Sequence, residues 1–206
     1  MSYISSYCHI SNNTLHVNGE ELTAINSTST EDVIKEIYTS LDIKYSKFHK
    51  MDEISKVSFI GTELIKNECP EINSYGENDI ALLFANQKSS ATTDLKFLDS
   101  YKNGGIPSPS LFVYTLPNIL IGEISIRNKW YGENMFTVSK EFDAQYFSSY
   151  CDILLNKNAE AALCGWVNVD DNKIEAFFFF VTKKDIKQLN LPLSSQKLKE
   201  IYHSIN

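Results

Sequence analysis

The sequence lacks the features that mark several large classes of protein. Only one of its 206 residues is an arginine, Arg127, and the formal net charge is −7. Binding to nucleic-acid phosphates needs clustered basic residues, so we expect no nucleic-acid partner. The longest apolar runs, such as Ala176 to Val181, have six residues, far fewer than the ~18 of a membrane span. The first residues carry no signal-peptide pattern, so cytoplasm is the expected location.

Cysteine and histidine are also scarce, with four of each and no metal-binding spacing. No two cysteines form a CxxC pair, and the histidines form neither HExxH nor HxxxH, so we expect no disulfide scaffold, no metal site and no cofactor. Each cysteine is expected to be a small buried hydrophobe. The set comprises Cys8, Cys69, Cys151 and Cys164, with His9, His16, His49 and His203.

What is present is an ordinary globular composition, with 43% apolar and 22% charged residues. This predicts a single domain over residues 1–206. Hydrophobic periodicity, caps and turn residues predict alternating strands and helices, hence an α/β layered mixed sheet with helices on both faces. The expected strands are 3–17, 80–85, 135–139, 161–169 and 174–182, and the first of them is interrupted near 11–13. The expected helices are 33–41, 52–67, 92–101, 119–126, 143–155 and 194–204, and residues 27–32 supply the N-terminal cap of the first.

Two apolar runs stand out among these elements. Ile80 to Ala85 is flanked by polar turns and predicts a strand that is buried on both faces. Phe177 to Phe180 most simply predicts a core strand, with an acyl tunnel lining as the alternative. A turn at 170–173 joins the last two strands as a hairpin, whereas 102–109 reads as a loop.

Three segments together resemble the N-terminal half of the β-ketoacyl synthases, the condensing enzymes of the thiolase-like fold. They are Tyr45–Asp52, Ile80–Asn86 and, most specifically, Tyr114–Arg127 followed by Tyr131–Asn134. The third is similar to the family's LPN-x3-G-x-I-x-I stretch and its GxN turn. The resemblance covers about residues 1–170. It implies a thiolase-like half, in a short chain-length-factor-like form typical of aryl polyene pathways.

Two departures from the family pattern decide the functional interpretation. The resemblance places Glu141 where a condensing enzyme has its nucleophilic cysteine, and Cys151 lies ten residues further on. A carboxylate cannot replace the thiolate, since a mixed anhydride would hydrolyse readily. The family's second half, which carries two catalytic histidines, has no counterpart in this sequence. We therefore predict no catalytic residues, with Glu141 as a pseudo-nucleophile.

Glu141 has two readings. In one it marks a pseudo-active site or plugs an acyl tunnel. In the other it is a surface or hydrogen-bonded carboxylate at a strand-to-helix turn. Lys140 or Arg127 would be its partner if it were buried.

The resemblance leaves three hypotheses for function. The first is a non-catalytic, chain-length-factor-like subunit of fatty-acid or polyketide-type biosynthesis that pairs with a full-length ketosynthase. The second is an acyl-carrier-dependent 3-oxoacyl synthase or decarboxylase that uses a non-cysteine site. The third is a stand-alone α/β module that binds an acyl or aromatic ligand.

The first hypothesis implies a dimer, with the chain itself or with a full-length ketosynthase, and an acyl carrier protein as a further partner. In the family, the strand before the nucleophile pairs with its equivalent across the dimer. We expect that interface to be centred on residues 114–139. The strand residues that would form it are Met135, Phe136, Thr137, Val138 and Ser139.

Two weaker polar clusters have mainly structural readings. His49 and Lys50 precede a helix, where solvated capping is expected rather than acid catalysis. Ser89, Ser90, Thr92 and Thr93 could cradle a phosphate at a helix N-terminus, but the glycines of a phosphate loop are absent.

Overall fold

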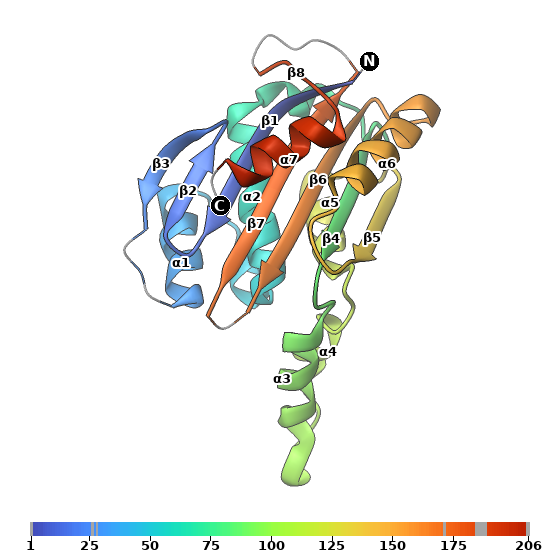
Figure 1. Cartoon of the computed structure of the whole chain (residues 1–206). Helices are drawn as coiled ribbons and strands as arrows, with labels where there is room; N and C mark the ends of the chain where they lie inside the picture. The colour runs from blue at the N-terminus through green and yellow to red at the C-terminus, as the bar shows by residue number, and fades with distance from the viewer. Residues whose placement is uncertain (1, 26, 28, 171, 184–188, 205–206) are drawn as a thin grey trace.

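The structure is a computed structural model that describes residues 2–25, 27, 29–170, 172–183 and 189–204. Its centre is one mixed sheet in which the strands follow the order β3-β2-β1-β7-β6-β4-β5, with the short β8 (Leu191–Pro192) paired to β1 (Figure 1). The other strands are β1 (Tyr3–Ser11), β2 (Thr14–Val17), β3 (Glu20–Ala24), β4 (Ile80–Asn86), β5 (Asn134–Val138), β6 (Ala161–Val169) and β7 (Ile174–Thr182).

The pairing divides the sheet into a parallel and an antiparallel part. β4 runs parallel to both of its neighbours, β5 and β6. From β6 through β7, β1 and β2 to β3, every pair is antiparallel. The predicted hairpin between β6 and β7 is confirmed, although Asp171 in its turn lies outside the described residues.

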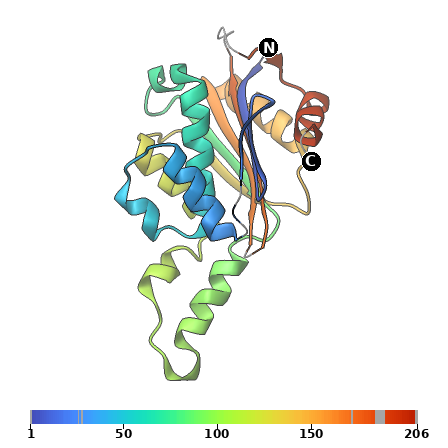
Figure 2. The ribbon, with the colours of Figure 1, turned by 90° about the vertical axis from the view of Figure 1, so that its left-hand side faces the viewer.

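Helices cover both faces of this sheet, as the sequence predicts (Figure 2). One face is packed by α1 (Thr30–Ser40), α2 (Glu53–Glu68) and α5 (Ile119–Asn128), and the other by α6 (Ala144–Lys157) and α7 (Ser195–His203). Each face has its own apolar core. In the part of the chain that is described, no helix is both long enough and apolar enough to cross a membrane.

Polar side chains fix where these helices begin. Ser29, Asp52, Asp143 and Ser194 each accept a hydrogen bond from a backbone N–H three residues later, at α1, α2, α6 and α7. Such caps stabilise a helix by about 1 kcal/mol each. The first of them lies within the predicted cap region 27–32, of which residue 28 lies outside the described residues.

Both apolar runs of the sequence are core strands. All seven residues of β4 are buried. In β7, Phe178 and Phe180 belong to the core beneath α2, whereas Phe177 and Phe179 belong to the core beneath α6 and α7. No part of the four rings is exposed, so this strand holds the two layers of helices together.

A helical arm projects from the sheet between β4 and β5 (Figures 1 and 2). It contains α3 (Ala91–Tyr101), the 3₁₀ turn η3 (Lys102–Gly104) and α4 (Pro109–Val113). The prediction of a plain loop after 102 was wrong at its end, because Ser108 caps α4 by accepting from the Leu111 N–H. The predicted cap of the preceding helix at 92–94 was also too late, since α3 begins at Ala91. Two further 3₁₀ turns, η1 (Ser46–Lys50) and η2 (Pro70–Ser74), flank α2.

Candidate functional site

The strand β5 forms one edge of the sheet. It pairs with β4 alone in the described part of the chain, from Leu82–Asn134 to Asn86–Val138, so its other edge is open. Met135 and Val138 are 37% and 51% exposed. An open, apolar edge strand invites pairing with another chain.

The five residues predicted for the interface do not contribute alike. Phe136 is partly buried and packs against the first core, and the Thr137 hydroxyl is hydrogen-bonded to the phenol of Tyr146. Ser139 lies just past β5, and its hydroxyl donates to the Glu141 carbonyl oxygen at 2.9 Å. Met135 and Val138 therefore offer the apolar surface of this edge, while the other three support it.

Exposed apolar side chains are concentrated in one stretch of the chain, which includes this edge strand. Among the described residues, twelve large apolar side chains are exposed; eleven of them lie between positions 95 and 153, and the twelfth is Leu22. Single exposed apolar residues need no explanation, whereas many of them in one part of a protein indicate an interaction surface. The eleven are Leu95, Tyr101, Ile106, Phe112, Val113, Leu116, Ile126, Tyr131, Met135, Val138 and Ile153.

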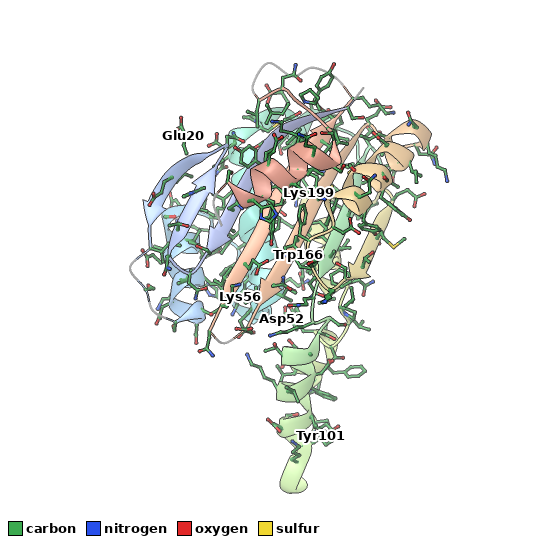
Figure 3. All side chains as sticks on the ribbon, viewed as in Figure 1. Glu20, Asp52, Lys56, Tyr101, Trp166 and Lys199 are labelled. Carbon is green, nitrogen blue, oxygen red and sulfur yellow. The ribbon has the colours of Figure 1, made fainter. Side chains whose placement is uncertain are left out.

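The arm carries five of the eleven and is held mainly at its base. Thr93 donates to the buried carboxylate of Asp52 at 2.9 Å, and Lys96 pairs with Glu53 at 2.9 Å. Burial raises the pKa of Asp52, although hydrogen bonds from Ser55 and Thr93 oppose the rise. Further out the arm packs on itself through Phe97, whose ring lies 5.3 Å from that of Tyr101. Figure 3 shows Tyr101 far from the sheet.

Glu141 lies on the turn between β5 and α6, as the sequence predicts. Its side chain is exposed, and neither proposed partner reaches it by a contact found in the structure. Arg127 instead lies 3.7 Å from Glu63 and stacks over the Tyr45 ring at 4.9 Å. The carbonyl of Lys140 accepts from the Gln87 side chain at 2.9 Å. The reading as an exposed carboxylate at a turn is the one that this environment supports.

A cavity of about 510 Å³ opens beside this turn, between the sheet and α7. Its floor is aromatic, because Phe142 stacks on Tyr202 at 4.4 Å and contacts Trp166 edge-on. Lysine and histidine side chains surround it, among them Lys199, which Figure 3 shows on α7 close to Trp166. The remaining lining residues are Gln87, Lys140, Glu141, Asn168, Glu175 and His203.

The carboxylate of Glu175 anchors this cavity and was missed in the sequence. It accepts from the Tyr202 phenol at 2.5 Å, the Trp166 indole at 3.1 Å and the Lys173 ammonium at 2.9 Å. Burial alone would raise the pKa of Glu175, but these three donors outweigh it and hold that pKa below the usual range. The only signal in the sequence was a single acid at the start of an apolar strand.

We predict that Glu175→Gln lowers the free energy of unfolding by about 1–3 kcal/mol at pH 7, because three donors lose their charged acceptor. The folded-state pKa lies below the unfolded value near 4.5, so the stabilisation is present above that pH and is lost as pH falls through the folded pKa. The variant should therefore show a flatter loss of stability below pH 4.5. Urea unfolding at pH 7 and at pH 4 measures both effects, and parallel curves for the two proteins would contradict the prediction.

The four cysteines form no reactive site. All are buried. Burial raises the pKa of Cys8, that of Cys69 to about 11 and that of Cys164, which keeps these thiols protonated and poorly nucleophilic at neutral pH. Cys151 lies inside α6, with its Sγ 3.3 Å from that of Cys164.

The remaining polar candidates serve the fold. His49 and Lys50 lie in η1, exposed at the surface. The hydroxyl of Ser90 donates to the Thr115 carbonyl at 2.9 Å, and that of Thr93 to Asp52. Ser90 and Thr93 line a hollow of about 160 Å³ at the carboxyl end of β4. Their hydroxyl groups, however, donate the two hydrogen bonds that attach the arm to the rest of the domain.

Comparison with known proteins identifies the fold. No family model and no curated protein matches the sequence. Among solved structures, one described as the ishigamide ketosynthase/chain length factor aligns with a TM-score of 0.64 at 9% identity, covering 91% of this chain and 63% of that chain. The fold is thiolase-like.

Two further structures show the same thiolase-like fold at different lengths. A type II polyketide ketosynthase–acyl-carrier-protein complex, AntDE:AntF, has a TM-score of 0.66 at 12% identity, covering 89% of this chain and 62% of that chain. This chain thus spans less than two thirds of the first two structures. The ketosynthase ApeO in complex with its chain length factor ApeC, from Xenorhabdus doucetiae, has a TM-score of 0.59 at 11% identity, covering 98% of this chain and 92% of that chain.

Proposed function

We propose that this chain is a non-catalytic, chain-length-factor-like subunit of a fatty-acid or polyketide-type pathway in the cytoplasm, of the aryl polyene kind. It pairs with a full-length ketosynthase through the β5 edge and the apolar region around it. The observation that carries the proposal is that, of the twelve exposed large apolar side chains among the described residues, eleven lie between 95 and 153, in the stretch that includes β5 and its open edge. Alignment over nearly the whole chain with a chain of similar length in a ketosynthase–chain length factor complex supports it.

The absence of an acyl acceptor supports the non-catalytic role. Acyl transfer in condensing enzymes needs a thiolate that both attacks and leaves. Here the turn before α6 carries the exposed Glu141, and the four thiols are buried. The paired ketosynthase would supply the chemistry, and an acyl carrier protein would deliver the chain to the pair.

We predict that the purified chain forms no stable acyl adduct when it is incubated with acyl- or malonyl-loaded carrier protein. Its intact mass should stay unchanged, whereas a full-length ketosynthase treated in parallel should gain the acyl mass. An adduct on any cysteine, or condensation activity that Glu141→Ala abolishes, would favour the second hypothesis, an enzyme with a non-cysteine site.

Glu141→Gln should leave the protein almost unchanged. The carboxylate is exposed, so the free energy of unfolding should shift by no more than about ±0.5 kcal/mol. The complex with a ketosynthase should also be retained. Denaturant unfolding and co-purification test the two statements, and a loss of several kcal/mol would reveal a dedicated partner for Glu141.

The experiment that tests the proposed function is co-expression with a ketosynthase encoded beside this chain, followed by sedimentation of the purified material. We expect a complex with one copy of each, and a self-associated dimer when the chain is alone. A monomer at tens of micromolar with no complex would refute the pairing.

A second candidate function rests on the cavity beside α7. Its volume of about 510 Å³ and the three aromatic rings in an otherwise polar lining suit an acyl or aromatic ligand that carries a polar group, which is the hypothesis of a stand-alone binding module. Quenching of tryptophan fluorescence by an aryl carboxylate, saturable in the isolated chain and lost in Trp166→Phe, would favour this function over pairing.

A further inference from the structure

Two of the four histidines lie side by side on the sheet. The hairpin that joins β1 to β2 places His9 opposite His16, between the pairs Cys8–Val17 and Ile10–Leu15. Directly opposed residues of an antiparallel pair point to the same face, with Cβ atoms about 4.5–5.5 Å apart. That face is the one covered by α7, since the His9 ring stacks on Phe177 at 4.5 Å.

The imidazoles of this pair have buried nitrogen atoms with no hydrogen-bond partner. Among the described residues, none forms a hydrogen bond to His9 Nε2, His16 Nδ1 or His16 Nε2. His9 as a whole is 6% exposed. A buried polar atom without a partner carries a free-energy penalty, and in a native protein it points to a missing water or ion.

The backbone orients one ring of the pair. The His9 imidazole is hydrogen-bonded to the backbone of Ile201, while its Nε2 has no partner among the described residues. Backbone carbonyls next to a histidine are the usual partners that orient a metal ligand.

The carboxylate residue Glu21 lies next to this histidine pair in the sheet. Glu21 on β3 is the register partner of His16, so Glu21, His16 and His9 lie next to one another across three strands. Among the described residues, no group of three histidine, cysteine, aspartate or glutamate side chains is placed so that it could hold a metal ion as it stands. His9 and His16 are thus register neighbours on one face, and the exposed Glu21 adjoins His16 in the register, so that rotation of these side chains could bring three ligands together.

We propose that His9 and His16 together bind one divalent late transition-metal ion, Zn²⁺, Ni²⁺ or Cu²⁺, with Glu21 or water completing its coordination. Imidazole favours these ions over Mg²⁺ and Ca²⁺, which prefer oxygen ligands. The site lies on the face covered by α7, away from β5, and the inference does not depend on the proposed pairing with a ketosynthase.

Isothermal titration of the tag-free chain with ZnCl₂ and with NiCl₂ tests the site. We expect one saturable site per chain, with a dissociation constant well below about 1 mM. His16→Asn should weaken binding by more than about tenfold, as should His9→Gln, while Glu21→Gln should have a smaller effect. MgCl₂ should give no saturable signal.

A matched control separates this site from adventitious surface histidines. His49→Asn removes an exposed histidine in η1 and should leave the affinity unchanged. His16 is only partly buried, so its variant guards against misfolding of the His9 variant, and circular dichroism checks both. Absence of saturable binding, which would assign the orphan nitrogens to water, or equal affinity in wild type and His16→Asn, would overturn the proposal.

Discussion

A lysine at position 138 is expected to dissociate the protein from its partner. Val138 is the most exposed residue of β5 whose side chain is apolar, at 51%, and it lies at the end of the open edge. A charge enclosed in an apolar contact loses its hydration without gaining a partner. We expect Val138→Lys to weaken association by at least about a hundredfold, or about 3 kcal/mol. Phe136→Lys should act in the same direction, but it also disturbs the core against which Phe136 packs.

The opposite edge of the sheet offers a matched control. Leu22 on β3 is 50% exposed, close to the exposure of Val138, and lies on an edge strand as well. Leu22→Lys should leave the complex intact. Sedimentation velocity of the three proteins, alone and with a ketosynthase, decides the matter: equal dissociation by both lysines, or by neither, would contradict the assignment of the interface to β5.

A side chain at position 61 is expected to destabilise the fold strongly. Gly61 lies where α2 crosses β7, and a Cβ there would meet the Phe178 ring at 2.3 Å. The ring cannot move away easily, since its other edge approaches Gly165, where an added Cβ would lie 3.2 Å from it. Overpacking of this kind costs about 1–3 kcal/mol, and we expect Gly61→Val to lie at the upper end of that range in urea unfolding.

A second glycine inside a helix supplies a control, because its replacement should stabilise the fold instead of destabilising it. Gly122 lies inside α5, and a Cβ there would have its nearest neighbour at 3.9 Å. Gly122→Ala should therefore raise the free energy of unfolding by about 0.5–1 kcal/mol, because alanine is the better helix former. If Gly61→Val proved neutral, the close approach of α2 to β7 would be wrong.

Local patterns predicted the elements better than their arrangement. The buried strand at 80–85 and the phenylalanine strand at 177–180 follow from continuous apolar runs, and both are confirmed. The helix α4 was missed because prolines and glycines dominate 104–109 and mask a cap at Ser108. Glycine and proline indicate turns locally, but a short helix between two of them leaves little periodicity.

The residues of the candidate site could be predicted only where their structural partners are close to them in the sequence. Glu141 could be located by counting from the turn at 132–134, and its exposure agrees with one of the two readings. The role of Glu175 could not be predicted, since its donors Trp166, Lys173 and Tyr202 come from β6, from the turn before β7 and from α7. The histidine pair was in principle accessible: in a hairpin centred on 12–13, residues 9 and 16 must face each other.

The position of β1 between β2 and β7 has a consequence for how the chain is made. β1 is synthesised long before β7, and one of its two edges stays unpaired until β7 has been made, because Ser11 pairs with Glu175 and Tyr3 with Thr182. At about 5–20 residues per second, that edge stays unpaired for roughly ten to thirty seconds. Pairing over such separations is slow even in the finished chain. Throughout that interval the nascent chain presents a β-hairpin with an unpaired apolar edge, which is a place where chains can associate wrongly.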